Sequence, residues 1–210
     1  MKIGFLLLIA AIGLPVSSAQ QPKPFLSPSC EDKIEAKARV SEELGAKFFQ
    51  VTTTSYREGI LENEDGSVQN TMGDAITEQD LLRVEQTAEC RSDHQGDHEM
   101  TLSLAEAKPR GMELSIFGGG PAYVGSLHVL IRPDLSYVCS FDARFFDPNV
   151  RARWKIIEKD LTLQEGSLEV GKRLYGRISV TLEEHHEESG KTVVNKIHGY
   201  FKPVIMGKNR

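Results

Sequence analysis

The clearest alternation of apolar and polar side chains runs from Leu174 to Lys202. In its first half, alternate residues are apolar or glycine: Leu174, Gly176, Ile178, Val180 and Leu182. The second half repeats the pattern at Val193, Ile197 and Phe201. Because side chains two apart in a strand share a face, both halves predict half-buried strands. The polar stretch His185–Gly190 between them predicts a turn, so the whole segment is expected to form a β-hairpin.

The apolar pattern also predicts a register for this hairpin. Pairing Leu182 with Val193 aligns the apolar faces and sets Gly176 opposite Gly199. A slip of one residue would turn one apolar set to the solvent, whereas a slip of two would keep it inside. In the first register the two glycines leave a gap on the buried face, and Trp154 is the residue expected to fill it.

Further strands are predicted from residue 100 onward, because runs rich in β-branched and aromatic residues alternate with Gly- and Pro-containing turns. These runs are Met100–Leu104, Met112–Phe117, Gly125–Ile131, Leu135–Phe146, Trp154–Ile157, Leu161–Leu163 and Ser167–Val170. The segment Gly118–Pro121 is expected to be one of the turns. This spacing predicts a mainly β fold, either a single antiparallel β-sandwich of the jelly-roll kind or a barrel.

The region before residue 100 is less regular. Cys30 to about Gly45 has high helix propensity and predicts one short N-terminal helix, although its apolar residues also alternate as in a strand. Lys47–Tyr56 and Ser67–Met72 are expected to be strands. Ile76–Cys90 fits either a strand or a capped helix, and the strand is preferred.

The first 19 residues predict a cleaved signal peptide. Lys2 precedes an apolar run that ends in Ser17-Ser18-Ala19, the small residues that a signal peptidase needs. The apolar run is shorter than the ~20 residues required to cross a bilayer. We therefore expect a signal peptide at 1–19, an extended proline-rich lead-in at 20–29 and a single domain at 30–210, without a transmembrane segment after cleavage. The expected location is secreted or periplasmic.

Charge argues against nucleic acid as a partner. The chain has a formal net charge of −5, which becomes −6 when Lys2 is removed with the signal peptide. A nucleic-acid-binding protein needs a basic face that neutralises phosphates. The expected partner is instead an unidentified protein or a carbohydrate.

Cys30, Cys90 and Cys139 all remain after signal removal, and an oxidising compartment allows one disulfide. Cys139 lies within an apolar strand pattern, where a small buried thiol is ordinary. Cys30 and Cys90 border polar segments, so Cys30–Cys90 is the predicted bond. Cys90–Cys139 and the absence of any disulfide remain open alternatives.

The densest set of potential metal ligands is the segment Cys90–Glu99, with sequence CRSDHQGDHE. Its imidazoles and carboxylates suit zinc or copper, and His94, His98 and Asp97 are the predicted ligands. A solvated loop between strands explains the same residues without a metal. The charged hairpin tip Glu183–Glu188 is predicted to be solvated, and a composite site formed by the tip and the His94 loop is a further hypothesis.

Motifs for catalysis are missing from the sequence. The chain has neither a G-x-S-x-G nucleophile elbow nor the lysine and Ser/Thr of a phosphate-binding loop beside Gly118–Gly120. The leading hypothesis is therefore an exported, non-catalytic β protein with a binding or structural role at the cell envelope or outside the cell, without a cofactor. The alternatives are a zinc- or copper-binding protein and, as a weaker one, a carbohydrate-active hydrolase with two facing carboxyl groups.

Overall fold

The computed structural model describes residues 30–31, 35–44, 60–62, 67–70, 73, 75–78, 81, 87–93, 98–120, 123–147 and 149–207. The predicted signal peptide, the lead-in and the predicted strand Lys47–Tyr56 lie outside these residues. Every named element in the described part is a strand, so the predicted mainly β fold is confirmed. Within the same residues, no helix has the length and apolar character needed to span a membrane.

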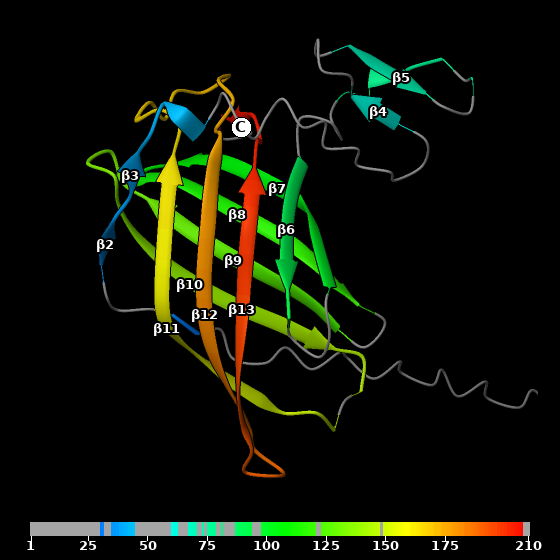
Figure 1. The fold of residues 1–210 in the computed structure, drawn as a ribbon, viewed down its shortest axis with the longest axis vertical. Coiled ribbons are helices and arrows are strands. Elements are labelled where there is room, and N and C mark those ends of the chain that lie inside the picture. The colour runs from blue at the N-terminus through cyan, green and yellow to red at the C-terminus, as the bar shows by residue number, and fades with distance from the viewer. Residues whose placement is uncertain are drawn as a thin grey trace, which may run out of the picture.

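Eight long strands form the body of the molecule (Figure 1). They are β6 (Thr87–Ser92), β7 (His98–Lys108), β8 (Gly111–Gly120), β9 (Tyr123–Ile131), β10 (Ser136–Phe145), β11 (Ala152–Leu163), β12 (Gly176–His186) and β13 (Thr192–Phe201). Each strand pairs antiparallel with the next, except that β10 does not pair with β11, and β13 returns to pair with β6. The sheet therefore curves around on itself, with β6, β11, β12 and β13 in front of β7 to β10 in Figure 1.

The N-terminal segment spans the seam between β10 and β11. Strands β1 (Cys30–Glu31) and β2 (Ala36–Lys37) pair with β10, whereas β3 (Arg39–Val40) pairs in parallel with β11. Strand β1 also contacts β11. The result is a nearly closed, mixed, barrel-like sheet with ten strands along its main path. Of the two predicted architectures, the barrel describes it better than the sandwich.

The predicted N-terminal helix is wrong. The described part of that region consists of β1, β2 and β3, followed by a turn at residue 42 and two helical residues, 43 and 44. Ala38 N donates to Leu135 O and Ser41 N donates to Leu163 O, so the segment is hydrogen-bonded to the loop before β10 and to β11. Pairing with two open sheet edges outweighs the local helix propensity, which is worth only tenths of a kcal/mol per residue.

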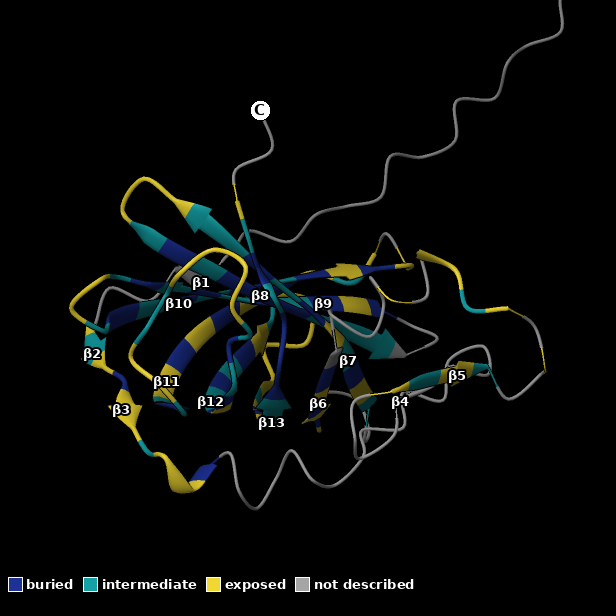
Figure 2. Ribbon diagram, turned by 90° about the horizontal axis from the view of Figure 1, so that it is seen from above, coloured by how far each residue is buried: buried dark blue, intermediate teal, exposed yellow. Residues whose placement is uncertain are grey.

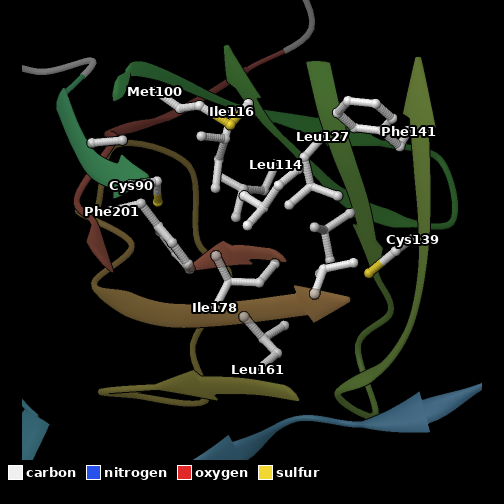
Figure 3. Packing of buried hydrophobic residues seen from close by; sticks show 14 of the residues in the cluster. Cys90, Met100, Leu114, Ile116, Leu127, Cys139, Phe141, Leu161, Ile178 and Phe201 are labelled. Atoms are coloured by element: carbon white, nitrogen blue, oxygen red, sulfur yellow. The ribbon is translucent and has the colours of Figure 1, made fainter. Parts of the chain in front are cut away.

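Apolar side chains fill the interior of the barrel. Along β11 and β12, buried and more exposed residues alternate, as Figure 2 shows by colour. Side chains from facing walls meet in the middle (Figure 3). The largest fully buried ones are Tyr123, Tyr137, Phe141, Phe201, Met100, Met112, Leu114, Ile116, Leu127, Ile131, Leu161 and Leu163. At ~25 cal/mol per Å² of buried apolar surface, this core is the main stabilising contribution to the fold.

The β12–β13 hairpin is confirmed, but its predicted register is wrong by two residues. Leu182 pairs with Asn195 rather than with Val193, and Gly176 pairs with Phe201. An ideal Cβ on Gly176 would lie 2.2 Å from Phe201 Cζ, so the phenylalanine ring fills the gap that we assigned to Trp154. Gly199 instead faces β6, where its ideal Cβ would lie 2.1 Å from Glu89 O.

Other boundaries differ from the prediction in smaller ways. Gly118–Gly120 belong to β8 rather than to a turn, and an ideal Cβ on Gly118 would lie 2.3 Å from Met100 Cα. The two strands predicted within residues 154–163 are one strand with a bulge after Ile156. Residues 167–170 are not a strand. Strands β4 (Ile60–Glu62) and β5 (Val68–Asn70) form a separate small sheet, and β14 (Ile205–Met206) pairs in parallel with β7.

Candidate functional site

Polar residues occupy inward positions at one end of the barrel, the lower end in Figure 1, where the β12–β13 turn lies. We call them the polar end cluster: Ser92, His98, Tyr123, Trp154, Glu184, His186 and Asn195. They come from the end of β6, the start of β7, the start of β9, the start of β11, the end of β12 and the start of β13. Neighbouring strands run antiparallel, so these termini meet at the same end of the barrel.

Glu184 is the most unusual member of the cluster. It is 1% exposed and continues the inward phase of Val180 and Leu182. Asn195 Nδ2 donates to Glu184 Oε2 at 2.7 Å, and His186 Nε2 lies 3.2 Å from Glu184 Oε1. Burial of a carboxylate is costly unless such partners compensate for the lost water. The His186 contact becomes an ion pair when the imidazole is protonated.

Tyr123 belongs to the opposite wall of the polar end cluster, at the start of β9. The ring is buried, stands edge-on to His98 at a centroid distance of 5.5 Å and contacts Phe145 at 6.1 Å. Burial raises the pKa of the Tyr123 hydroxyl, a hydrogen bond with Ser92 lowers it, and the negative charge of Glu184 raises it further. The hydroxyl therefore stays protonated at neutral pH and serves as a hydrogen-bonding group.

Trp154 lies directly opposite Glu184 in the β11–β12 register. Its ring is 6% exposed and stacks on Phe145 at a centroid distance of 5.9 Å and an interplanar angle of 12°. Phe141 meets it edge-on at 5.4 Å. Trp154 Nε1 has no hydrogen-bond partner among the described residues. A buried indole N–H and a buried carboxylate are thus neighbours at this end of the barrel.

The predicted metal ligands are only partly described. His98 begins β7 and belongs to the polar end cluster, whereas His94 and Asp97 lie outside the described residues. The two residues that flank this undescribed segment, Asp93 and His98, follow β6 and begin β7 at the polar end. The described residues contain no group of three or more His, Cys, Asp or Glu arranged to hold a metal ion.

The hairpin tip Glu183–Glu188 is not uniformly solvated as predicted. Glu184 is buried and His186 is half-buried, whereas His185 and Glu187 are exposed. Sequence reasoning missed Glu184 and Asn195 as interior residues, although the signal was available. Both residues fall on the inward phase of their strands, two positions beyond Leu182 and two before Ile197.

The described residues do not contain the predicted Cys30–Cys90 bond. Cys90 is a free thiol, buried in β6, with Sγ 3.4 Å from Tyr200 O. Cys30 lies in β1, separated from β6 along the sheet path by β10, β9, β8 and β7. Burial raises the pKa of the Cys90 thiol, and the nearby charge of Glu89 adds to this effect. The thiol is therefore not suited to be a nucleophile. Cys139 is buried in β10, as predicted.

A second polar set, which sequence reasoning also missed, lies on the outer face of β8, β9 and β10. Ser115 Oγ is 2.8 Å from His128 Nδ1, His128 Nε2 is 3.1 Å from Asp142 Oδ2, and Glu113 Oε1 is 3.5 Å from His128 Nδ1. The hydrogen bond with Asp142 raises the pKa of His128, burial lowers it, and the charges of Asp142 and Glu113 raise it. The signal in the sequence was three polar residues at outward positions of successive strands.

This outer set does not match a catalytic triad. A triad histidine must be neutral to accept the serine proton, whereas two carboxylates favour the protonated form of His128. Ser115 is 9% exposed and lies mid-strand, where the neighbouring backbone N–H groups serve the β-ladder rather than an oxyanion hole. Glu113 and Asp142 lie along the surface of the sheet. The set is best explained as a cross-strand stabilising network.

Comparisons of the chain with protein-family models, with curated proteins and with solved structures find no match. Of the two polar sets, the polar end cluster is the one in which a buried charge, an aromatic hydroxyl and an indole N–H gather at an end of the barrel.

Proposed function

We propose that the protein is an exported, non-catalytic binding protein and that it recognises its ligand at the polar end of the barrel. The observation that carries this proposal is the burial of Glu184 opposite Trp154. An apolar pair at these positions would stabilise the barrel at least as well, because buried charges seldom add stability over a hydrophobic replacement. A role in binding gives a reason for retaining the carboxylate. The predicted signal peptide supports a secreted or periplasmic location.

The chemistry of the cluster favours a small ligand rich in hydroxyl or amino groups. Glu184 and Asn195 have acceptor oxygens, Trp154 Nε1 is a donor, and the buried rings of Trp154, Phe145 and Tyr123 lie beside them. Sugars present this combination of donors, acceptors and apolar faces. The groups that could serve as nucleophiles argue against catalysis, since Cys90 is buried with a raised pKa and Ser115 lies in the outer network.

The test uses the single tryptophan of the chain as a reporter. Neutral sugars, amino sugars and uronic acids are titrated into the mature protein while Trp154 fluorescence is recorded. We expect at least one class to cause a saturable change. Glu184→Gln should abolish this change, because the amide no longer offers a charged acceptor. Glu183→Gln is the matched control, since Glu183 is the preceding residue on the same strand and points to the other face.

Two results would contradict the proposal. One is the absence of a saturable change with all three classes of sugar, checked by calorimetry in case binding leaves the fluorescence unchanged. The other is binding that Glu184→Gln and Glu183→Gln affect equally. Circular dichroism of both variants would establish that they retain the β-fold.

A second candidate function is metal binding at the same end of the barrel. The observation that favours it is the position of Asp93 and His98, which bring both ends of the segment containing His94 and Asp97 to the polar end cluster. Zinc and copper suit such a set of imidazoles and carboxylates. Elemental analysis of protein purified without a tag should show stoichiometric zinc or copper that His98→Ala reduces. Protein without stoichiometric metal, even after incubation with either ion and desalting, would exclude this function.

A further inference from the structure

We propose that a groove on the outer face of β3, β11 and β12 binds a small anion that carries a phosphate or carboxylate group. The groove has a volume of about 460 Å³, and Arg39, Thr162 and Arg177 line it together with Ser41 and Glu43. This volume lies within the range of ~300–1,000 Å³ that is typical of small-molecule sites. The groove lies at the opposite ends of β11 and β12 from the polar end cluster, so it is a separate site.

Two arginines and a threonine form a row across the groove. Thr162 pairs with Arg39 of β3 on one side and with Arg177 of β12 on the other. Side chains that lie opposite each other on paired strands are close, with Cβ atoms ~4.5–5.5 Å apart. The threonine hydroxyl therefore lies between the stems of two guanidinium-bearing side chains.

Both guanidinium groups already converge on a carboxylate. Arg39 Nη2 lies 2.6 Å from Asp160 Oδ2, and Arg177 Nη2 lies 3.9 Å from the same oxygen. The side chains of both arginines are exposed enough to reach a ligand as well, at 64% for Arg39 and 44% for Arg177. Guanidinium groups offer several N–H donors in a planar fork that matches carboxylate and phosphate oxygens. Two guanidinium groups thus already face one carboxylate oxygen of Asp160, as they would face an oxygen of a bound anion.

The buried hydroxyl of Thr162 is a separate indication that the groove binds a ligand. Its side chain is on the outward face of β11 yet 5% exposed, and Oγ1 has no hydrogen-bond partner in the described part of the chain. A buried hydroxyl normally has a partner. A phosphate or carboxylate oxygen seated between Arg39 and Arg177 would accept this O–H and complete the site.

The formal charges around the groove balance, so the directed guanidinium donors rather than a net positive charge favour an anion. Arg39 and Arg177 carry two positive charges against the single negative charge of Asp160. Glu43, which also lines the groove, carries a further negative charge that offsets the remaining one. Removal of Asp160 should therefore strengthen anion binding, whereas removal of either arginine should weaken it. These opposite signs distinguish a binding site from a surface ion-pair network.

The experiment titrates inorganic phosphate, and separately acetate, into the mature protein at constant ionic strength and follows the backbone amide resonances of residues 160–163 by NMR. Arg177→Gln should weaken phosphate binding about tenfold or more, because it removes a charge-assisted hydrogen bond. Thr162→Val keeps the shape of the side chain and should weaken binding about fivefold. Asp160→Asn should strengthen binding about threefold or more.

Arg153→Gln is the matched control, because Arg153 forms a similarly exposed ion pair with Glu187 elsewhere on β11. It should leave phosphate binding unchanged. Saturation by phosphate but not acetate would assign the groove to phosphate-bearing ligands, and saturation by both would support the wider class. Absence of saturable shifts with either anion, equal weakening by Arg177→Gln and Arg153→Gln, or weaker binding by Asp160→Asn would overturn the proposal. A melting curve for each variant shows whether it is folded.

Discussion

Gly176 and Glu184 lie on the same inward face of β12, eight residues apart, but in opposite environments. Gly176 leaves room for the Phe201 ring, and this part of the barrel is closed by apolar packing. Glu184 accepts a hydrogen bond from Asn195 and lies 3.2 Å from His186 Nε2, so the other end is closed by polar contacts. Apolar packing excludes water and polar ligands, whereas a hydrogen-bonded cluster can exchange partners with them. This difference between the two ends is why ligand binding is proposed at the polar end.

Phe201→Ala, at the apolar end, should lower the free energy of unfolding more than any substitution at the polar end. The substitution removes a fully buried ring and leaves a cavity beside Gly176, which has no side chain to fill it. We expect the free energy of unfolding to fall by about 3–5 kcal/mol, measured by urea denaturation. Val194→Ala is a control on the same strand, because Val194 is 58% exposed, and should change stability by less than about 0.5 kcal/mol. A similar loss in both variants would mean that the packed end is not the main source of stability.

The polar end should respond differently. Asn195→Ala removes the donor to a buried carboxylate and should lower the free energy of unfolding by about 1–3 kcal/mol. The double substitution Glu184→Leu with Asn195→Leu removes both partners and should be close to neutral or stabilising. Chemical denaturation of the single and double variants measures both effects. If the double variant were as unstable as Asn195→Ala, the cluster would be needed for folding rather than retained for binding.

The sequence predicted most of the long strands, because their two-residue alternation is strong, whereas the region of β6 fitted a strand or a capped helix and β11 was predicted as two strands. The interior position of Glu184 was also predictable, because Glu184 lies two residues after Leu182 on the same face of the strand. The hairpin register could not be read from alternation, since a two-residue slip keeps the same faces. That choice depends on contacts far apart in sequence, such as the close approach of Gly199 to Glu89 on β6.

The strands of the N-terminal region also depend on contacts that are distant in sequence. Residues after Cys30 have helix propensity, and only the open edges of β10 and β11 make short strands more favourable. Those edges are created by residues about a hundred positions further along the chain. Likewise, the outer network around His128 requires β8, β9 and β10 to be in register, which no local pattern specifies.

The outer network around His128 should contribute less to stability than the polar end cluster, and its contribution should depend on pH. Because the pKa of His128 is raised above its ordinary value of 6.5, the folded state holds this proton more tightly than the unfolded state. The resulting stabilisation is fully present below about pH 6.5 and is lost as the pH rises through the raised pKa. It should stay below about 1 kcal/mol, since the site is partly exposed. Melting curves should show His128→Gln to be more destabilising at about pH 6 than at about pH 9. A difference that does not vary with pH would mean that the pKa of His128 is the same in the folded and unfolded protein.

Alkylation of Cys90 tests burial of the core directly and requires no substitution. The free thiol is 1% exposed and its pKa is raised, so little thiolate forms and no reagent reaches it in the folded state. We expect iodoacetamide to leave Cys90 unmodified in native protein and to alkylate it fully in urea, as read by peptide mass spectrometry without reduction. Rapid alkylation of the native protein would show that the wall formed by β6 opens, and a Cys90 peptide linked to Cys30 would show that the disulfide forms in solution after all.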